Sequence, residues 1–141
     1  MITAQEIKTE VLGLGACSLV HSAESIADLI ALLKTPQGRE FSRKYNYPSL
    51  ELLRKFKDEI ANYGVYVDAG FVTFHNQSDI ILAGDTFAVY SVRAIDKPYY
   101  LCVMEGAKVI VNSYDYSVCL VDRIGGEAEV HEYDNSKVKL K

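Results

Sequence analysis

The sequence lacks the features of a membrane-spanning or disulfide-stabilised protein. It contains no run of about 18 apolar residues, the length that a membrane helix needs. Its start, MITAQEIKTEVLG, has no basic leader followed by an apolar core, so we expect no signal peptide. The three cysteines, Cys17, Cys102 and Cys119, are odd in number and lack CxxC spacing. This pattern favours reduced thiols in a soluble, cytoplasmic protein.

The chain also lacks an excess of positive charge. Its 15 basic and 19 acidic residues give a formal net charge of −4, so no net positive field attracts a phosphate backbone. Basic residues between positions 39 and 57 alternate with acidic ones, as on a solvated helix face. We therefore expect no direct nucleic-acid partner.

Tryptophan is absent, whereas tyrosine is abundant. The 141 residues include ten Tyr and five Phe, and six of the tyrosines follow residue 89. Tyrosine is enriched in interaction surfaces because it offers a large rigid area with a polar tip. The length fits one compact domain, or one domain with a small appendage.

The first 64 residues carry helical signals. TAQE at 3–6 has the form of a capping box and predicts the start of a first helix. Ser22 is expected to cap a second helix, and Pro36 to begin a third. Residues 48–64 predict one longer fourth helix that ends at Gly64.

After Gly64 the pattern changes to short runs of Val, Tyr, Ile and Phe separated by Gly, Asp and Asn. Such runs are typical of β-strands. The candidate strands are 65–67, 71–74, 80–82, 87–92, 99–104, 108–111, 118–121, 128–131 and 137–140.

The end of the chain repeats with a period of 19 residues, so that YDNS at 133–136 aligns with YDYS at 114–117. The apolar pairs aligned by this shift are Val130 with Val111, Ala128 with Val109, Val138 with Cys119 and Leu140 with Val121. The alternate positions vary freely, which is typical of the inward and outward sides of a stacked β structure. A second shift of 19 aligns weaker pairs, namely Val92 with Val111, residues 95–96 with 114–115, Tyr100 with Cys119, and Cys102 with Val121.

These patterns predict an α+β protein in which a helical head, residues 1–64, caps a short β-solenoid, residues 65–141. The solenoid is expected to have about three to four coils with two principal strands per coil. An antiparallel β meander or small jelly roll is the alternative. The last coil of a solenoid has open edges, and Lys137, Lys139 and Lys141 would place charge there unless the edge is used for a homodimer.

Candidate catalytic and metal-binding residues are few. Cys17 and His21 would share one helical turn, but no Asn or Asp lies beside them to orient the imidazole. His75 and His131 lack zinc-site spacing to any further ligand, so we expect surface histidines, no metal and no cofactor. Glu127 would lie beside Glu129 at a distance compatible with glycosidase carboxylates, but no aromatic cleft is indicated around them. We therefore do not expect an enzyme.

The stretch RKYNYPSLELLRKFKDEIANYGVYVD, followed by a β tail with YD.S units, resembles a group of small proteins encoded by phages and mobile elements of gut bacteria. The resemblance spans residues 43–141 and implies a helical head followed by a repeat solenoid. Such elements encode many compact inhibitors of host defence, including anti-CRISPR proteins. The resemblance therefore implies a protein-binding inhibitor and transfers no catalytic residues.

The leading functional expectation is a non-enzymatic protein-binding module, in its most concrete form an inhibitor of a host defence nuclease complex. An acidic protein can present carboxylates where phosphates would lie. The candidate partner-binding residues are Asp115, Tyr116, Asp122, Glu127, Glu129, Glu132 and Asp134. The alternative is a structural protein that assembles through the open solenoid edge.

Overall fold

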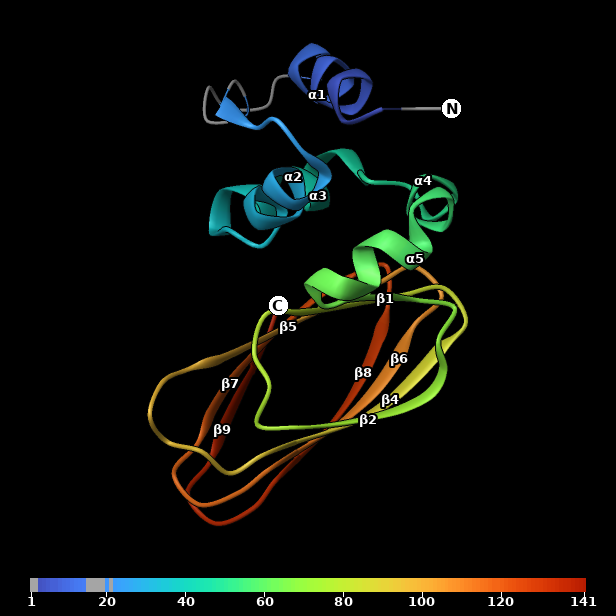
Figure 1. Ribbon diagram of the computed structural model, residues 1–141. Helices are drawn as coiled ribbons and strands as arrows, with labels where there is room; N and C mark the ends of the chain where they lie inside the picture. The colour runs from blue at the N-terminus through green and yellow to red at the C-terminus, as the bar shows by residue number, and fades with distance from the viewer. Residues whose placement is uncertain (1–2, 15–19, 21) are drawn as a thin grey trace. The chain divides into compact units, whose positions relative to one another are not determined.

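The computed structural model describes residues 3–14, 20 and 22–141. The chain divides into two compact units, Met1–Ser49 and Leu50–Lys141, which are described separately below. Helix gives way to strand later in the chain, at Gly64, so the second unit contains both helices and strands (Figure 1).

The first unit contains α1 (Ala4–Gly13), α2 (Ile26–Leu33) and α3 (Pro36–Tyr45). The predicted capping box is confirmed, because the Thr3 hydroxyl accepts from the Glu6 N–H and the Glu6 carboxylate accepts from the Thr3 N–H. The predicted cap of α2 is wrong: Ser25, not Ser22, accepts the hydrogen bond of a first-turn N–H, from Asp28. Ser25 has the extended backbone that a cap requires and directly precedes the apolar stripe.

The second unit begins with α4 (Leu50–Lys55), α5 (Lys57–Ile60) and the 3-10 helix η2 (Ala61–Tyr63). The prediction of one helix over this stretch is wrong, because the backbone of Phe56 leaves the helical region at φ −111°. The break redirects the chain so that α5 and η2 contact the first strand, β1, and Ile60 is buried. Gly64, with φ +79°, ends the helical segment as predicted.

The remaining residues form nine strands in two parallel sheets. Sheet A has the order β1-β3-β5-β7-β9 and sheet B the order β2-β4-β6-β8, so successive strands alternate between the sheets (Figure 1). The strands are β1 Val65–Val67, β2 Gly70–His75, β3 Ile80–Ala83, β4 Thr86–Val92, β5 Tyr99–Met104, β6 Lys108–Ser113, β7 Val118–Ile124, β8 Glu127–Glu132 and β9 Lys137–Leu140. All seven ladders are parallel, and each coil contributes one strand to each sheet. The predicted α+β fold with a β-solenoid is confirmed at about four coils, and the antiparallel alternative is wrong.

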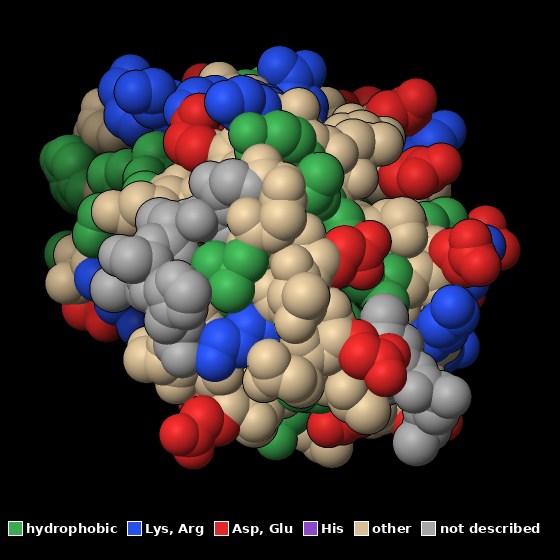
Figure 2. Space-filling view, turned by 90° about the horizontal axis from the view of Figure 1, so that it is seen from above, with side chains coloured by type: hydrophobic (Ala, Val, Ile, Leu, Met, Phe, Trp, Pro, Cys, Tyr) green, Lys and Arg blue, Asp and Glu red, His purple; other side chains and the backbone are tan. Residues whose placement is uncertain are grey.

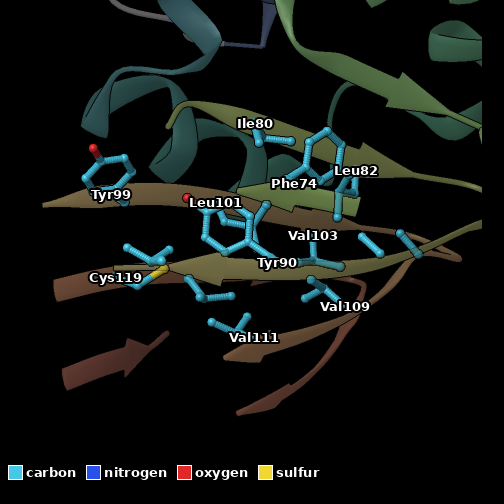
Figure 3. Close-up of a cluster of buried hydrophobic side chains, with 14 residues drawn as sticks. Phe74, Ile80, Leu82, Tyr90, Tyr99, Leu101, Val103, Val109, Val111 and Cys119 are labelled. Atoms are coloured by element: carbon cyan, nitrogen blue, oxygen red, sulfur yellow. The ribbon is translucent and has the colours of Figure 1, made fainter. Parts of the chain in front are cut away.

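The core lies between the two sheets, and its buried side chains come from β2 to β7 (Figure 3), whereas β1, β8 and β9 add partly buried side chains. Tyr90, at its centre, is fully buried, and its hydroxyl donates to the Gln77 carbonyl. Burial raises the pKa of Tyr90 above its usual value and that of the Cys119 thiol to about 12. Both groups are therefore neutral packing elements of the core.

The predicted 19-residue register holds only in the last coils. Val111 pairs with Val130 and Cys119 with Val138, as expected. The second shift is wrong, because Val111 pairs with Tyr90 and Cys119 with Tyr99. The reason is loop length. The loop 105–107 between β5 and β6 is one residue longer than the loop 125–126 between β7 and β8, and the loop 93–98 before β5 is two residues longer than the loops 114–117 and 133–136.

This change of register moves Cys102 to the other side of its strand. Cys102 pairs with Asp122, whereas its neighbour Leu101 pairs with Val121 in the core. Because side chains alternate along a strand, Cys102 points outward and not inward as predicted. It is nevertheless buried, as are Ile81, Ala83 and Met104, which also lie on the outward sides of β3 and β5.

Candidate functional site at the open coil

The repeated YD.S segments form one corner of the solenoid, where β6 turns into β7 and β8 into β9. The rings of Tyr114 and Tyr133 are stacked, with centroids 5.0 Å apart and planes inclined by 9°. The guanidinium carbon of Arg93 lies 3.9 Å from the centroid of the Tyr114 ring. One side chain from each of three coils therefore forms a continuous stack, which we call the tyrosine corner (Arg93, Tyr114 and Tyr133).

The third copy of this corner is Arg93, not residues 95–96 as the sequence suggested. Tyr133 N–H donates to the Ser113 carbonyl of the preceding coil, and Tyr114 N–H donates to the Val92 carbonyl in the same way. Arg93 follows Val92, so it occupies the equivalent position. Ile95 instead lies in the longer loop and is 67% exposed.

The Asp and Ser side chains of the repeat stabilise the turn backbone. Asp115 and Asp134 adopt left-handed backbone with φ +59° and +58°. The Asp134 carboxylate accepts the N–H of Asp115 at 2.9 Å. Ser136 is buried and donates to the carbonyl of Tyr133 in its own turn, at 2.6 Å. The repeat is thus an architectural unit that holds one coil against the next.

The predicted acidic residues of β8 all have partners within the chain. The Glu127 carboxylate lies 3.2 Å from Lys108 Nζ, and the Glu129 carboxylate 2.8 Å from His131 Nε2. Glu132 Oε2 accepts the N–H of Val138 at 2.8 Å. The contacts of Glu127 with Lys108 and of Glu129 with His131 both lie on the outward face of sheet B. His131 is therefore at the surface, as expected.

The structure brings together most of the predicted partner-binding residues, but not all of them. Asp115, Asp134 and Glu132 lie at or next to the tyrosine corner, and Tyr116 is 69% exposed there. Asp122 is on the outward side of β7 in sheet A, the other sheet from Glu127 and Glu129. The predicted acidic surface is therefore divided between two faces of the solenoid.

The last coil, formed by β8 and β9, has an open end that is apolar as well as charged. Ala128, Val130 and Val138 point toward the core but are only partly buried, and Leu140 is 38% exposed. The N–H groups of Lys137 and Lys141 bond to β7, so in a parallel ladder the backbone of Val138 points to the open side.

Glu132 links the two strands of this open end, because it belongs to β8 and accepts the N–H of Val138 in β9. The sequence contained one signal for this contact. The 19-residue shift aligns Glu132 with Ser113, which is buried, so a charged residue occupies an inward position of the repeat. An inward charge at an edge is a known device against strand addition.

The other candidate reactive groups do not assemble into a site. Among residues 3–14, 20 and 22–141, no group of three or more His, Cys, Asp or Glu side chains is placed to hold a metal ion. His75 is exposed and contacts the amide of the adjacent Asn76. The Cys17 and His21 pair lies outside the described residues.

The structure and the comparisons with known proteins give few further constraints. On the face drawn in Figure 2, Lys and Arg side chains lie among Asp and Glu side chains, so this face has no uniform charge. No helix among the described residues has the length and apolarity needed to cross a membrane. The chain matches no protein-family model, no curated protein and no solved structure.

Proposed function

We propose that the protein is a non-enzymatic protein-binding module whose last two coils carry the binding surface. The observation that supports this most is the exposed Tyr116, two residues after the stacked Tyr114, with Asp115 in the same turn and Asp134 in the next. Tyrosines of this kind are frequent anchors in protein interfaces. A corner already fixed by stacking and hydrogen bonds loses little conformational entropy on binding.

The most concrete version is an inhibitor, encoded by a phage or mobile element, that acts on a host defence nuclease complex in the cytoplasm. The net charge of −4 and the acidic turns are compatible with occupation of a basic nucleic-acid channel. Lys108 reduces the field of the Glu127 carboxylate in β8. Tyr116 and the two turn aspartates are therefore the main contact residues in this proposal.

The test is affinity capture from a bacterial lysate at low and high salt. We expect the wild-type chain to retain a partner that Tyr116→Ala and Asp115→Asn lose, and whose binding weakens as salt rises. Ile95→Ala is the matched control, because Ile95 is 67% exposed and Tyr116 is 69% exposed. Retention of the partner by Tyr116→Ala, or the absence of any partner, contradicts the proposal.

A second candidate function is assembly through the open end of the solenoid. It is favoured by the partly exposed inward residues of β8 and β9, which a further layer of structure would cover. Light scattering over a range of protein concentrations tests it. A mass that stays monomeric throughout contradicts assembly and leaves the first proposal intact.

A further inference from the structure

The open end offers both backbone groups and apolar side chains to a partner. β8 and β9 are the last strands of sheets B and A, so each has one neighbour only. In a parallel ladder, alternate residues direct their N–H and C=O groups to the same side. In β9 these are Val138 and Leu140, and in β8 they are Ala128 and Val130, whose side chains point inward. Added strands would therefore extend both the ladders and the core.

The two open strands have opposite charge on their outward sides. In β9 and just after it, the outward positions hold Lys137, Lys139 and Lys141. In β8 they hold Glu127, Glu129 and His131. Pairing of β9 with β9, or of β8 with β8, would set like charges opposite each other, which is destabilising. Pairing of β9 with β8 sets opposite charges together.

The opposite end of sheet A is not open in the same way. β1 contacts α5 and η2, and Val65 and Val67 are buried. Head-to-tail addition onto β1 would displace these helices. Two open ends that meet avoid this cost and give a closed, isologous pair.

We propose that the open end binds a second copy of this chain about a two-fold axis, with β9 of each copy antiparallel to β8 of its partner. One register pairs every residue of β9. In it Lys139 lies opposite Glu129 of the partner copy, and Lys141 lies opposite the partner's Glu127. On the inward side Val138 faces the partner's Val130, and Leu140 faces the partner's Ala128. The two cores thereby become one.

Glu132 regulates this pairing in the single copy. Its carboxylate accepts the Val138 N–H, which in the pair donates to the carbonyl of the partner's Val130. Glu132 must therefore release Val138 before the strands join. It acts as an internal competitor that keeps the association reversible.

This inference rests on the second candidate function and gives it a partner. The first test is sedimentation velocity over a wide range of protein concentrations, where we expect a reversible monomer–dimer equilibrium. Glu132→Ala should lower the dimer Kd, because the internal competitor is gone. A wild-type chain that stays monomeric overturns both the inference and the assembly function. Larger open-ended assemblies support assembly but overturn the two-fold pair.

A charge exchange tests the proposed strand pairing. Lys139→Glu and Glu129→Lys should each raise the dimer Kd about tenfold, since each change places like charges opposite each other twice per dimer. The variant with both changes should recover the wild-type Kd. Lys55→Glu, an equal charge change on exposed α4, is the control. Failure of the double variant to recover, with all variants folded by circular dichroism, overturns the pairing.

Cysteine cross-linking tests the register directly. Lys139→Cys combined with Glu129→Cys should give a disulfide-linked dimer on mild oxidation, because the two positions face each other only between copies. Within one copy they lie in different sheets and point outward. Lys139→Cys combined with Val118→Cys, in the neighbouring strand, should give no such dimer. Equal cross-linking of both pairs overturns the register.

Discussion

The first and last coils of the solenoid share one topology but differ in what surrounds them. Both valines of β1 and all four residues of β3 are buried, and β1 contacts α5 and η2. β8 and β9 contain no buried residue, and in the part of the chain that the structure describes no further strand pairs with them on the open side. The sequence repeat is clearest in the open coils and weakest in the covered ones.

This difference shows what a repeat pattern records. An open coil is constrained only on its inward side, so its outward positions vary and the alternation stays visible. A covered coil is apolar on both sides, as Ile81 and Leu82 show, and its alternation disappears. Coil spacing also varies there, from 16 residues between Val65 and Ile81 to 21 between Ile80 and Leu101.

The largest expected effect comes from truncating the core in the two regions. Leu101→Ala should lower the free energy of unfolding by about 3 to 4 kcal/mol, because Leu101 is 2% exposed and its neighbours cannot fill the cavity. Val130→Ala, at the partly exposed end, should cost about 1 kcal/mol. Urea denaturation at one protein concentration measures both. Equal losses would mean that the open coil is as well packed as the covered one.

Two glycines with the same backbone conformation test the packing of the turns around Asp68, which we call the covered corner. Gly84 has φ +67°, and a Cβ there would collide with the Asp68 carboxylate, so Gly84→Ala should cost about 2 to 3 kcal/mol. Gly70 has φ +70° with nothing within 4 Å of a Cβ, so Gly70→Ala should cost about 1 kcal/mol of backbone strain. Thermal denaturation measures the difference. If Gly70→Ala is the more damaging change, the packing explanation is wrong.

The tyrosine corner should be the main stabilising contact of the open coils. Tyr133→Ala removes a stacked ring and should cost about 1 kcal/mol. Tyr116→Ala removes a ring that is 69% exposed, and should leave the free energy of unfolding nearly unchanged. Denaturant titration of both variants compares them. A large loss from Tyr116→Ala would assign that residue to the fold and weaken its proposed role in binding.

The smallest effect concerns the covered corner at low pH. Arg54 and the Asp85 N–H hold the pKa of Asp68 at about 2, below its usual value, because they stabilise the carboxylate. This contribution to stability is complete above the unfolded-state pKa near 4 and is lost as the pH falls toward 2. The free energy of unfolding of the wild type should exceed that of Asp68→Asn by less than about 1 kcal/mol at neutral pH. This difference should disappear by pH 2.

The control for this titration is Asp58→Asn, on exposed α5. It makes the same carboxylate-to-amide change as Asp68→Asn, so it reports the general effect of losing one negative charge over the same pH range. Stability measured by denaturant at each pH gives the comparison. A gap between wild type and Asp68→Asn that persists at the acidic limit would show that the carboxylate charge is not what stabilises the corner.

Local patterns predicted the fold well because they depend on neighbours in sequence. The strand runs, the Gly64 helix end and the 19-residue register of the last coils follow from alternation and turn chemistry. The break at Phe56 and the register between β5 and β7 were not predicted, because they depend on packing between distant segments. A loop longer by one residue, as at 105–107, moves the side chains of the paired strand to its other face.

The candidate site was predicted less completely than the fold. The stack of Tyr114 on Tyr133 followed from the repeat, but the addition of Arg93 required the true register. The contact between Glu132 and Val138 joins strands of different sheets, so no pattern within one strand specifies it. Asp122 lies in a different sheet from Glu127 and Glu129, and the sequence does not specify which sheet a strand joins.

The order of the coils, from the covered first coil to the open last one, follows the direction of protein synthesis. Within the second unit, α4 and α5 are synthesised before β1, and β8 and β9 are synthesised after the strands with which they pair. Each new coil can therefore fold onto strands that are already made. Its strands pair with those of the coil made just before, so the paired strands are close in sequence.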